Sequence, residues 1–337
     1  MRVGERKVTI TVIAEEAGVS VPTVSRVLNG RSDVSPQTRA RIEALLQQHG
    51  YQRRASRKRD SAGLIDLVFN DLDSPWAVEI IRGVEDVAHA AALGTVVSAV
   101  HRHSGATRKW LENLRTRASD GVILVLSTLQ PAHEAELRRL NVPTVVIDPA
   151  GGPALDVPTI GATNWAGGMA ATQHLISLGH RRIGHITGPP ALLCSRARLD
   201  GYRAALDAAG IPIDDALIRP GDFYHESGFK GAGELMDLRK PPTAIFAASD
   251  QMALGVYEGL RQRGLRVPDD VSVVGFDDLP EARWSSPPLT TVRQPLTEMG
   301  MLAARTVLRL ARGEQPDSPR VELATDLVVR DSSEHVK

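Results

Sequence analysis

The sequence predicts an α/β protein with an N-terminal all-α helix-turn-helix head, over residues 1–60, and two Rossmann-like, doubly wound lobes, over residues 61–337. Three observations predict this. Basic residues concentrate at the N-terminus, capping and turn residues divide the head into three short helices, and strand and helix patterns alternate through the remainder. At roughly 150 residues per domain, 337 residues allow two or three domains. Apolar residues make up 42% of the chain, which is enough to form sizeable cores.

The composition excludes several classes of protein. The single cysteine, Cys194, rules out an intramolecular disulfide framework and a multi-thiolate zinc site, and it is typical of a reducing compartment. No run of 18 apolar residues exists, and no apolar signal-peptide core follows the N-terminus. The sequence contains no dinucleotide-binding fingerprint, P-loop, nucleophile elbow or convincing metal-ligand spacing. We therefore expect a soluble protein of the cytoplasm and nucleoid, without a membrane partner, a metal or a cofactor.

Charge is unevenly distributed, although the whole chain has a formal net charge of zero. Residues 1–59 contain twelve basic and five acidic side chains, which gives this segment a charge of +7. The remainder has 28 basic and 35 acidic side chains and therefore a charge of −7. This asymmetry is typical of a nucleic-acid-binding segment joined to an acidic body, although charge alone leaves a basic solvated surface as the alternative.

Three short helices are expected in the head, over residues 10–17, 21–28 and 36–49. Thr9, Ser20 and Ser35 precede them and carry the hydroxyl groups that cap helix N-termini. Gly18 allows the positive φ of a tight turn between the first two helices. Such a unit is a helix-turn-helix, in which the start of the second helix enters the major groove. The residues left on the outer face of that helix are Val21, Pro22, Thr23, Ser25 and Arg26.

A specific motif surrounds the second predicted helix. It reads Val19-Ser20-Val21-Pro22-Thr23-Val24-Ser25-Arg26-Val27-Leu28-Asn29-Gly30, followed by Val34-Ser35 and Thr38-Arg39. This motif resembles the headpiece of the LacI/GalR family of bacterial repressors, and the resemblance places Val21, Pro22 and Thr23 at base-reading positions. Thr23 can contact a thymine methyl group or a base-edge acceptor, whereas Val21 and Pro22 offer only apolar contacts. Phosphate contacts are implied for Ser20, Ser25, Arg26 and Asn29, with helix capping alone as the alternative for Ser20 and Asn29.

The segment after Tyr51 departs from the family pattern. Members usually have a proline–asparagine pair, then alanines and a leucine that wedges into the minor groove and bends the duplex. Here Arg53 and Arg54 replace the pair, and Asp60 stands in place of the leucine. We hypothesise that the five cations between residues 53 and 59 line the minor groove or bind phosphates instead, and a disordered basic linker is the alternative. The candidate DNA-binding residues are Thr9, Ser20, Val21, Pro22, Thr23, Ser25, Arg26, Asn29, Tyr51, Arg53, Arg54 and Arg57.

Strand and helix patterns alternate from residue 63 onward, which predicts parallel, doubly wound sheets. In the first half, strands are expected over residues 64–69, 94–100, 121–126 and 144–147, and helices over 77–92, 108–117 and 131–140. In the second half, helices are expected over 167–178, 198–209, 227–238 and 251–264, and strands over 182–187, 218–222, 244–247 and 271–276. A strand near 289–293, a helix to residue 310 and a segment over 321–329 follow. Lobe one is therefore expected over about 63–162 and 293–320, and lobe two over about 163–290 and 321–330, with three crossings between them.

The body carries further motifs. They are Gly179-His180-Arg181-Arg182-Ile183-Gly184, Ser195-Arg196-Ala197-Arg198, Ser249-Asp250-Gln251-Met252-Ala253-Leu254-Gly255 and Val273-Val274-Gly275-Phe276-Asp277-Asp278. They resemble the effector domain of the same family, which has the fold of periplasmic sugar-binding proteins. The resemblance implies a ligand-binding arginine at Arg198 and a ligand-binding carboxylate at Asp277.

A sugar site requires planar polar groups for the hydroxyls and an aromatic face for the C–H side. Trp76 and Phe223 are candidate stacking platforms, and a core position is the alternative for Phe223. Asp250 can bond the ligand or cap its helix, Asp278 is expected to be structural, and Cys194 is expected to be a passive buried residue. The candidate ligand-binding residues are Ser74, Trp76, Asp148, Arg198, Phe223, Asp250 and Asp277.

A DNA-binding head joined to a two-lobed binding body predicts a transcriptional repressor. We expect a sugar bound between the lobes to control operator affinity allosterically, and a homodimer to read two half-sites of double-stranded operator DNA. Induction and corepression by the sugar are alternative signs of this coupling. A periplasmic transport protein would lack the head and need an export signal, and a sugar-acting enzyme would need paired carboxylates that spacing does not reveal. We therefore do not expect an enzyme.

Overall fold

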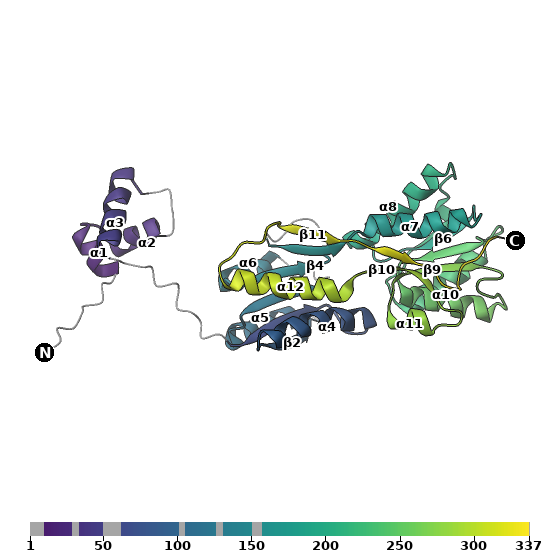
Figure 1. Cartoon of the computed structure of the whole chain (residues 1–337), viewed down its shortest axis with the longest axis horizontal. Coiled ribbons are helices and arrows are strands. Elements are labelled where there is room, and N and C mark those ends of the chain that lie inside the picture. Colours follow the sequence, from purple (N-terminus) through teal and green to yellow (C-terminus); the bar gives the residue numbers. More distant parts are fainter. Residues whose placement is uncertain are drawn as a thin grey trace. The chain divides into compact units, whose positions relative to one another are not determined.

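The structure is a computed structural model that describes residues 10–28, 34–49, 62–100, 105–125, 131–149 and 157–336. The chain divides into two compact units, residues 1–60 and 61–337. The described part of the first unit contains three helices, α1 (Ile10–Glu16), α2 (Val21–Leu28) and α3 (Pro36–Gln48) (Figure 1). Within the described residues, no helix is both long enough and apolar enough to cross a membrane.

Each of the three helices contributes to one core in the head. Ile13, Val24 and Ile42, one from each helix, are fully buried. Gly18 takes a φ of +60° in the turn between α1 and α2, a conformation that residues with a Cβ atom seldom adopt. His49 Nε2 lies 2.6 Å from Glu16 Oε2, which joins the end of α3 to the end of α1. The predicted helix-turn-helix head is therefore confirmed.

Lobe one contains a parallel sheet with the strand order β11-β5-β4-β3-β1-β2. Its strands are β1 (Leu64–Phe69), β2 (Gly94–Ala99), β3 (Gly121–Val125), β4 (Thr144–Ile147), β5 (Thr159–Ala162) and β11 (Arg320–Leu323). Helices α4 (Pro75–Ala90) and α12 (Leu296–Ala311) lie side by side on one face (Figure 1). Helices α5 (Ala106–Arg117) and α6 (Pro131–Leu140) cover the other face.

Lobe two repeats this architecture with the strand order β12-β10-β9-β8-β6-β7, in which only β12 is antiparallel to its neighbour. The strands are β6 (Ile183–Ile186), β7 (Ile218–Arg219), β8 (Ala244–Ala247), β9 (Ser272–Asp277), β10 (Thr290–Arg293) and β12 (Asp326–Val328). Helices α7 (Asn164–Ser177) and α8 (Leu193–Ala208) cover one face of this sheet. Helices α9 (His225–Met236) and α10 (Asp250–Gln262) cover the other face. Lobe two also contains the short helix α11 (Pro280–Trp284) and a 3-10 turn at Asp215–Leu217. The two predicted doubly wound lobes are confirmed.

The chain crosses between the lobes three times, after β5, after β10 and after β11. The last crossing lies later than predicted, because residues 321–323 belong to the sheet of lobe one rather than to lobe two. The predicted single segment over 321–329 is interrupted at Thr325, whose backbone N–H donates to Thr163 Oγ1 at 3.0 Å. This bond joins the first crossing to the third and ends β11 before lobe two begins.

Close packing of α7 against α8 fixes the part of lobe two that faces lobe one. A Cβ atom on Gly168 would lie 2.4 Å from the backbone oxygen of Arg198, and one on Gly201 would lie 2.2 Å from the backbone oxygen of Trp165. Only glycine permits this approach. The first turn of α7, which begins at Asn164, is thereby held against the α8 turn that carries Arg198.

Candidate DNA-binding and effector sites

A cavity of about 470 Å³ lies between the two lobes, where the carboxyl ends of their strands meet. Both sheets contribute to its wall, as expected for a ligand site in a doubly wound fold. Six of the seven candidate ligand-binding residues line it. They are Ser74, Trp76, Asp148, Arg198, Phe223 and Asp277. Asp250 is not among the lining residues.

Arg198 is the centre of the polar wall and is only 3% exposed. Its Nε donates to Asn164 Oδ1 at 2.8 Å, and its Nη1 donates to the backbone oxygen of Ala248 at 2.6 Å. The guanidinium carbon lies 3.8 Å from the centroid of the Phe276 ring, in a cation–π contact. Nη1 is also 3.8 Å from Asp277 Oδ1. These contacts hold the guanidinium in one orientation, which suits it to bidentate hydrogen bonding with a ligand.

Two buried aspartates face this arginine. Asp277 Oδ1 accepts a hydrogen bond from Gln294 Nε2 at 2.6 Å, and its backbone has a φ of +124°. Burial raises the pKa of Asp277 from 3.8 to about 7, although the positive charge of Arg198 opposes the shift. Burial likewise raises the pKa of Asp148 to about 6, again against the attraction of Arg198. Burial therefore disfavours the charged form of both carboxyls, and the positive charge of Arg198 partly offsets this effect.

The aromatic residues are held by their neighbours. Ser74 Oγ caps α4 by accepting a hydrogen bond from the Trp76 backbone N–H at 3.3 Å. Trp76 is 9% exposed and packs on the core of lobe one while it also lines the cavity. Phe223 has a φ of +76°, and its backbone oxygen accepts from Ser249 Oγ at 2.8 Å. The Phe223 ring lies against Gly188, where an added Cβ atom would approach it to 2.2 Å. Phe223 thus lines the cavity from lobe two, opposite the lobe that carries Trp76.

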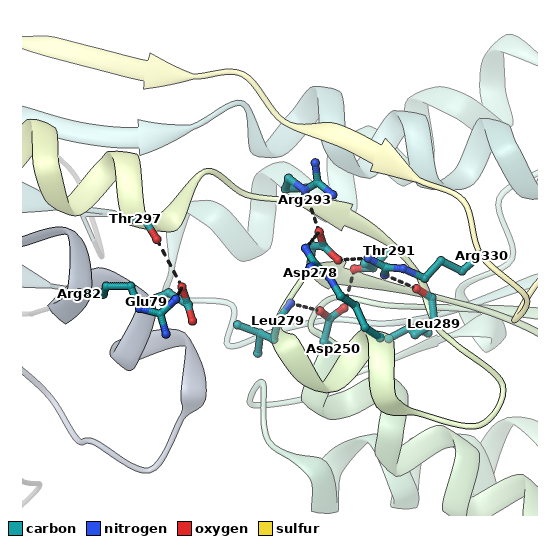
Figure 2. A network of polar contacts seen from close by, with 11 residues as sticks. Glu79, Arg82, Asp250, Asp278, Leu279, Leu289, Thr291, Arg293, Thr297 and Arg330 are labelled. Carbon is teal, nitrogen blue, oxygen red and sulfur yellow. Dashed lines mark hydrogen bonds and ion pairs between the residues drawn. The ribbon is translucent and has the colours of Figure 1, made fainter.

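Asp250 has a different environment from the other candidates. Its Oδ1 accepts a hydrogen bond from Thr291 Oγ1 at 2.5 Å, and its Oδ2 accepts from the Leu279 backbone N–H at 2.8 Å (Figure 2). The side chain is fully buried, and burial raises the pKa of this carboxyl well above 3.8. The predicted alternative of a helix cap is also not met, because Ser249 is the N-cap of α10 and accepts from the Met252 N–H. Asp250 therefore joins β10 to the start of α11.

Several lining residues were not predicted from the sequence. They are Phe69, Asn70, Asp71, Thr107, Tyr224, Ser249 and Gln251. Asn70 and Asp71 directly follow β1, so the rule that ligand residues follow strand ends would have found them. Tyr224 Oη donates to Asp71 Oδ1 at 2.6 Å, and this bond joins lobe two to lobe one at the cavity wall.

Replacement of Tyr224 by phenylalanine is expected to speed the dissociation of a bound effector about fivefold, because one hydrogen bond between the lobes is lost. The measurement is stopped-flow dissociation of the small molecule that most raises the melting temperature of the wild-type protein. Tyr257→Phe is the matched control, because Tyr257 Oη donates to the Pro287 backbone oxygen within lobe two. Equal dissociation rates in wild type and Tyr224→Phe would contradict the interlobe role of this bond.

The structure describes only part of the candidate DNA-binding set. Six of these residues lie outside the described residues: Thr9, Asn29, Tyr51, Arg53, Arg54 and Arg57. The arginine hypothesis for the hinge therefore stays a prediction. On α2, Pro22 and Arg26 are exposed, whereas Thr23 and Ser25 are half-buried. Val21 packs in part against the core of the head.

Ser20 and Thr23 form a local unit at the N-terminus of α2. The Ser20 and Thr23 hydroxyl oxygens are 2.9 Å apart, and the Thr23 backbone N–H donates to Ser20 Oγ at 3.4 Å. Ser20 therefore acts as the helix cap that was its alternative role. Ser35 and Thr38 repeat the arrangement at the start of α3, with the Thr38 N–H donating to Ser35 Oγ at 3.2 Å.

Comparison with known proteins identifies both units. Residues 9–54 match the profile described as "Bacterial regulatory proteins, lacI family", and residues 172–333 match a "Periplasmic binding protein-like domain". The HTH-type transcriptional repressor CytR of Escherichia coli (strain K12) is 34% identical over 332 residues, which are 98% of this chain and 97% of that protein. The chain belongs to the lacI family.

Solved structures of transcriptional regulators align with nearly the whole chain. A complex of the transcriptional regulator CelR with cellobiose aligns with a TM-score of 0.75 and 35% identity. The alignment covers 97% of this chain and 100% of the CelR chain. A lac repressor dimer bound to operator and the anti-inducer ONPF has a TM-score of 0.72 and 30% identity, with coverage of 98% and 100%. The predicted family, the helix-turn-helix head and the fold of the body are therefore confirmed, and this lacI family member is a DNA-binding transcriptional regulator.

Proposed function

We propose that the chain is a transcriptional repressor whose affinity for operator DNA is controlled by a small sugar in the interlobe cavity. The observation that carries the proposal is the polar wall of that cavity. Arg198 is held by Asn164 and Ala248, and it lies beside Asp277 in a cavity that both lobes form. A ligand that bonds to both lobes stabilises one relative placement of them, which is the requirement for allosteric control. CelR was solved with cellobiose, and CytR is named a repressor.

The charges of the cavity favour a neutral polyhydroxy effector. Among the described lining residues, four are aspartates and one is an arginine. They are Asp71, Asp148, Asp222, Asp277 and Arg198. This excess of carboxyl groups would repel a phosphorylated sugar or a sugar acid, whereas neutral hydroxyls can donate to the carboxylates and accept from Arg198. The aromatic walls from Trp76 and Phe223 suit the C–H face of a sugar ring.

We further propose that the protein binds DNA as a homodimer. We also propose that it acts in the cytoplasm, at the nucleoid, and that it is not an enzyme. A single head of this size offers few base contacts, and two heads related by two-fold symmetry read two half-sites. The lac repressor with which the chain aligns over 98% of its length was solved as a dimer on its operator.

A thermal-shift screen of neutral and phosphorylated sugars, followed by operator binding with and without the best hit, tests the effector proposal. We expect a neutral pentose, hexose or disaccharide to raise the melting temperature and to change operator affinity. Stabilisation by phosphorylated sugars alone would reject the neutral class, and an effector that leaves operator affinity unchanged would reject allosteric control. The operator is obtained by in vitro selection from random DNA.

Substitution of Thr23 is expected to separate base reading from phosphate binding. Thr23→Ala should weaken binding to the selected operator about tenfold and leave binding to random DNA unchanged, because the lost contact is to a base edge. Arg26→Ala should weaken both and reduce the salt slope by about one, because a phosphate contact releases a counterion. Fluorescence anisotropy over a range of KCl concentrations measures both quantities. An equal loss on operator and random DNA in Thr23→Ala would contradict the base-reading role.

A further inference from the structure

The side chains of two consecutive aspartates at the carboxyl end of β9 lie in different environments. Asp277, the last residue of β9, and Asp278 both have positive φ values, of +124° and +57°. Asp277 lines the cavity, whereas the Asp278 side chain is only 1% exposed and is bound to arginines. Asp278 Oδ2 accepts from Arg293 Nε at 2.7 Å, and Arg330 Nη2 donates to Asp278 Oδ1 (Figure 2). The turn therefore has one carboxyl on the cavity and one in a cationic cluster.

One of the two arginines directly precedes a crossing between the lobes, and the other follows the last strand of lobe two. Arg293 is the last residue of β10 and directly precedes the second crossing. Its neighbour Gln294 donates to Asp277, so adjacent residues of the crossing bind adjacent residues of the turn. Arg330 follows β12, the strand that the third crossing leads into. Asp278 thus ties the turn to the start of the second crossing and to the segment that follows β12.

The three arginines near Asp278 differ in burial, and their burial determines how strongly each of them holds the turn. The Arg330 side chain is 14% exposed, and its Nη1 also donates to the Leu289 backbone oxygen at 2.7 Å. The Arg293 side chain is 48% exposed. The Arg283 side chain is 62% exposed, and its Nη2 is 3.7 Å from Asp278 Oδ2. Because exposed ion pairs contribute little, the Arg330 contact should hold the turn most strongly and the Arg283 contact least.

The far end of the second crossing is also bound. Thr297, in the first turn of α12, has its Oγ1 3.3 Å from Glu79 Oε2 on α4, and Arg82 Nη1 donates to the same carboxylate at 3.0 Å. Helix α4 also carries Trp76, which lines the cavity from lobe one. The five residues from Arg293 to Thr297 therefore connect the turn in lobe two with the helix that presents an aromatic side chain in lobe one.

We propose that Asp278 is a positioning residue for the effector site: with Arg330 and Arg293 it holds the turn so that Asp277 faces the cavity, and through Arg293 it ties that turn to the start of the second crossing. The charges nearby explain why Asp277 lines the cavity while Asp278 is bound to arginines. Three buried carboxyls, Asp148, Asp250 and Asp277, already lie around Arg198 or one another. Asp278 adds to the repulsion between carboxyls at Asp250, and its arginine partners offset the charge of the fourth carboxyl. The proposal rests on the proposed function only in that Asp277 binds the effector.

The test compares Asp278→Asn with Arg283→Ala, a control variant that removes an exposed arginine from the same carboxylate. Crystal structures of the sugar-free proteins give a readout that needs no effector. We expect the Gln294 Nε2 to Asp277 Oδ1 distance to exceed 3.5 Å in Asp278→Asn and to stay near 2.6 Å in Arg283→Ala. Isothermal titration with the best sugar of the screen should show affinity at least about tenfold weaker in Asp278→Asn. Operator affinity without sugar should be unchanged in Arg283→Ala, and in Asp278→Asn it should fall much less than sugar affinity.

Arg330 supplies the second, conservative comparison. Arg330→Ala should reproduce the loss of sugar affinity, and Arg330→Lys should restore part of it, because lysine keeps the charge but cannot bridge Asp278 and the Leu289 oxygen. An unmoved Asp277 in the Asp278→Asn crystal structure overturns the proposal. The proposal is also overturned if Asp278→Asn weakens sugar binding and sugar-free operator binding to a similar degree and lowers the melting temperature. That result would indicate a purely structural role for Asp278. If no sugar binds the wild type, the effector proposal fails, while the crystal structures still decide the role of Asp278.

Discussion

Replacing Arg198 with alanine abolishes the thermal stabilisation given by the effector and lowers the stability of the free protein. The effector loses its only charged hydrogen-bond donor among the described lining residues, so its affinity should fall about 100-fold or more. The free protein loses the cation that lies beside Asp277 and Asp148. Leaving buried carboxyls without that partner should cost about 3 kcal/mol at pH 8. Differential scanning fluorimetry with and without sugar measures both effects.

Two variants on the same helix sharpen this experiment. Arg196→Ala is the matched control, because Arg196 lies on α8 but is exposed. Arg198→Lys keeps the charge yet cannot bond to Asn164 and Ala248 together, so it should recover stability more than effector affinity. A full thermal shift retained in Arg198→Ala would refute the assigned effector site.

Replacing Asp277 with asparagine removes effector binding but stabilises the free protein above neutral pH. Burial raises the pKa of Asp277 from 3.8 to about 7, so the folded state keeps a proton that the unfolded state releases as the pH rises. Ionisation of the buried Asp277 carboxyl lowers the folding stability of the wild type. This loss of stability is absent below pH 4, grows between pH 4 and 7, and is complete above pH 7. Asparagine does not ionise and can still accept from Gln294. The expected gain at pH 8 is on the order of 2 kcal/mol, and it disappears at pH 4.

Thermal melts of both proteins from pH 4 to pH 8 measure this difference. Asp222→Asn is the control, because Asp222 also lines the cavity but is exposed. A difference between Asp277→Asn and wild type that is the same at pH 4.5 and pH 8 would show that the Asp277 carboxyl is not destabilised by burial. A gain at high pH together with lost effector binding would show that function keeps a destabilising group in place.

The strength of local patterns decided how much of the fold could be predicted. Helix α2 and strands β1, β4 and β8 have the predicted bounds, because capping residues or uninterrupted apolar runs mark their ends. Strand β5 was not predicted, because it has only four residues, Thr-Ile-Gly-Ala, and a glycine interrupts them. It exists because β4 and β11 pair with it from either side. Pairing of this kind is absent from local sequence.

The site was predictable where a residue's position in a strand fixes its direction. Asp148 and Asp277 lie at the carboxyl ends of β4 and β9, and both line the cavity. Asp250 also follows a strand closely, but its carboxyl is satisfied by Thr291 and the Leu279 N–H, partners far away in the sequence. The bond from Tyr224 to Asp71 joins two lobes, and no local pattern indicates it. Contacts between distant segments therefore set the limit of prediction.

The immobilisation of Arg198 has a consequence for the order of events in binding. Its hydrogen-bond and stacking partners, Asn164, Ala248 and Phe276, all belong to lobe two. The guanidinium is therefore oriented before any effector arrives, and little rotamer entropy is lost when it binds. We expect the effector to dock first on lobe two, as on a rigid template, and lobe one to engage in a slower second step. Binding kinetics should then be biphasic, with a concentration-dependent encounter followed by a concentration-independent closure.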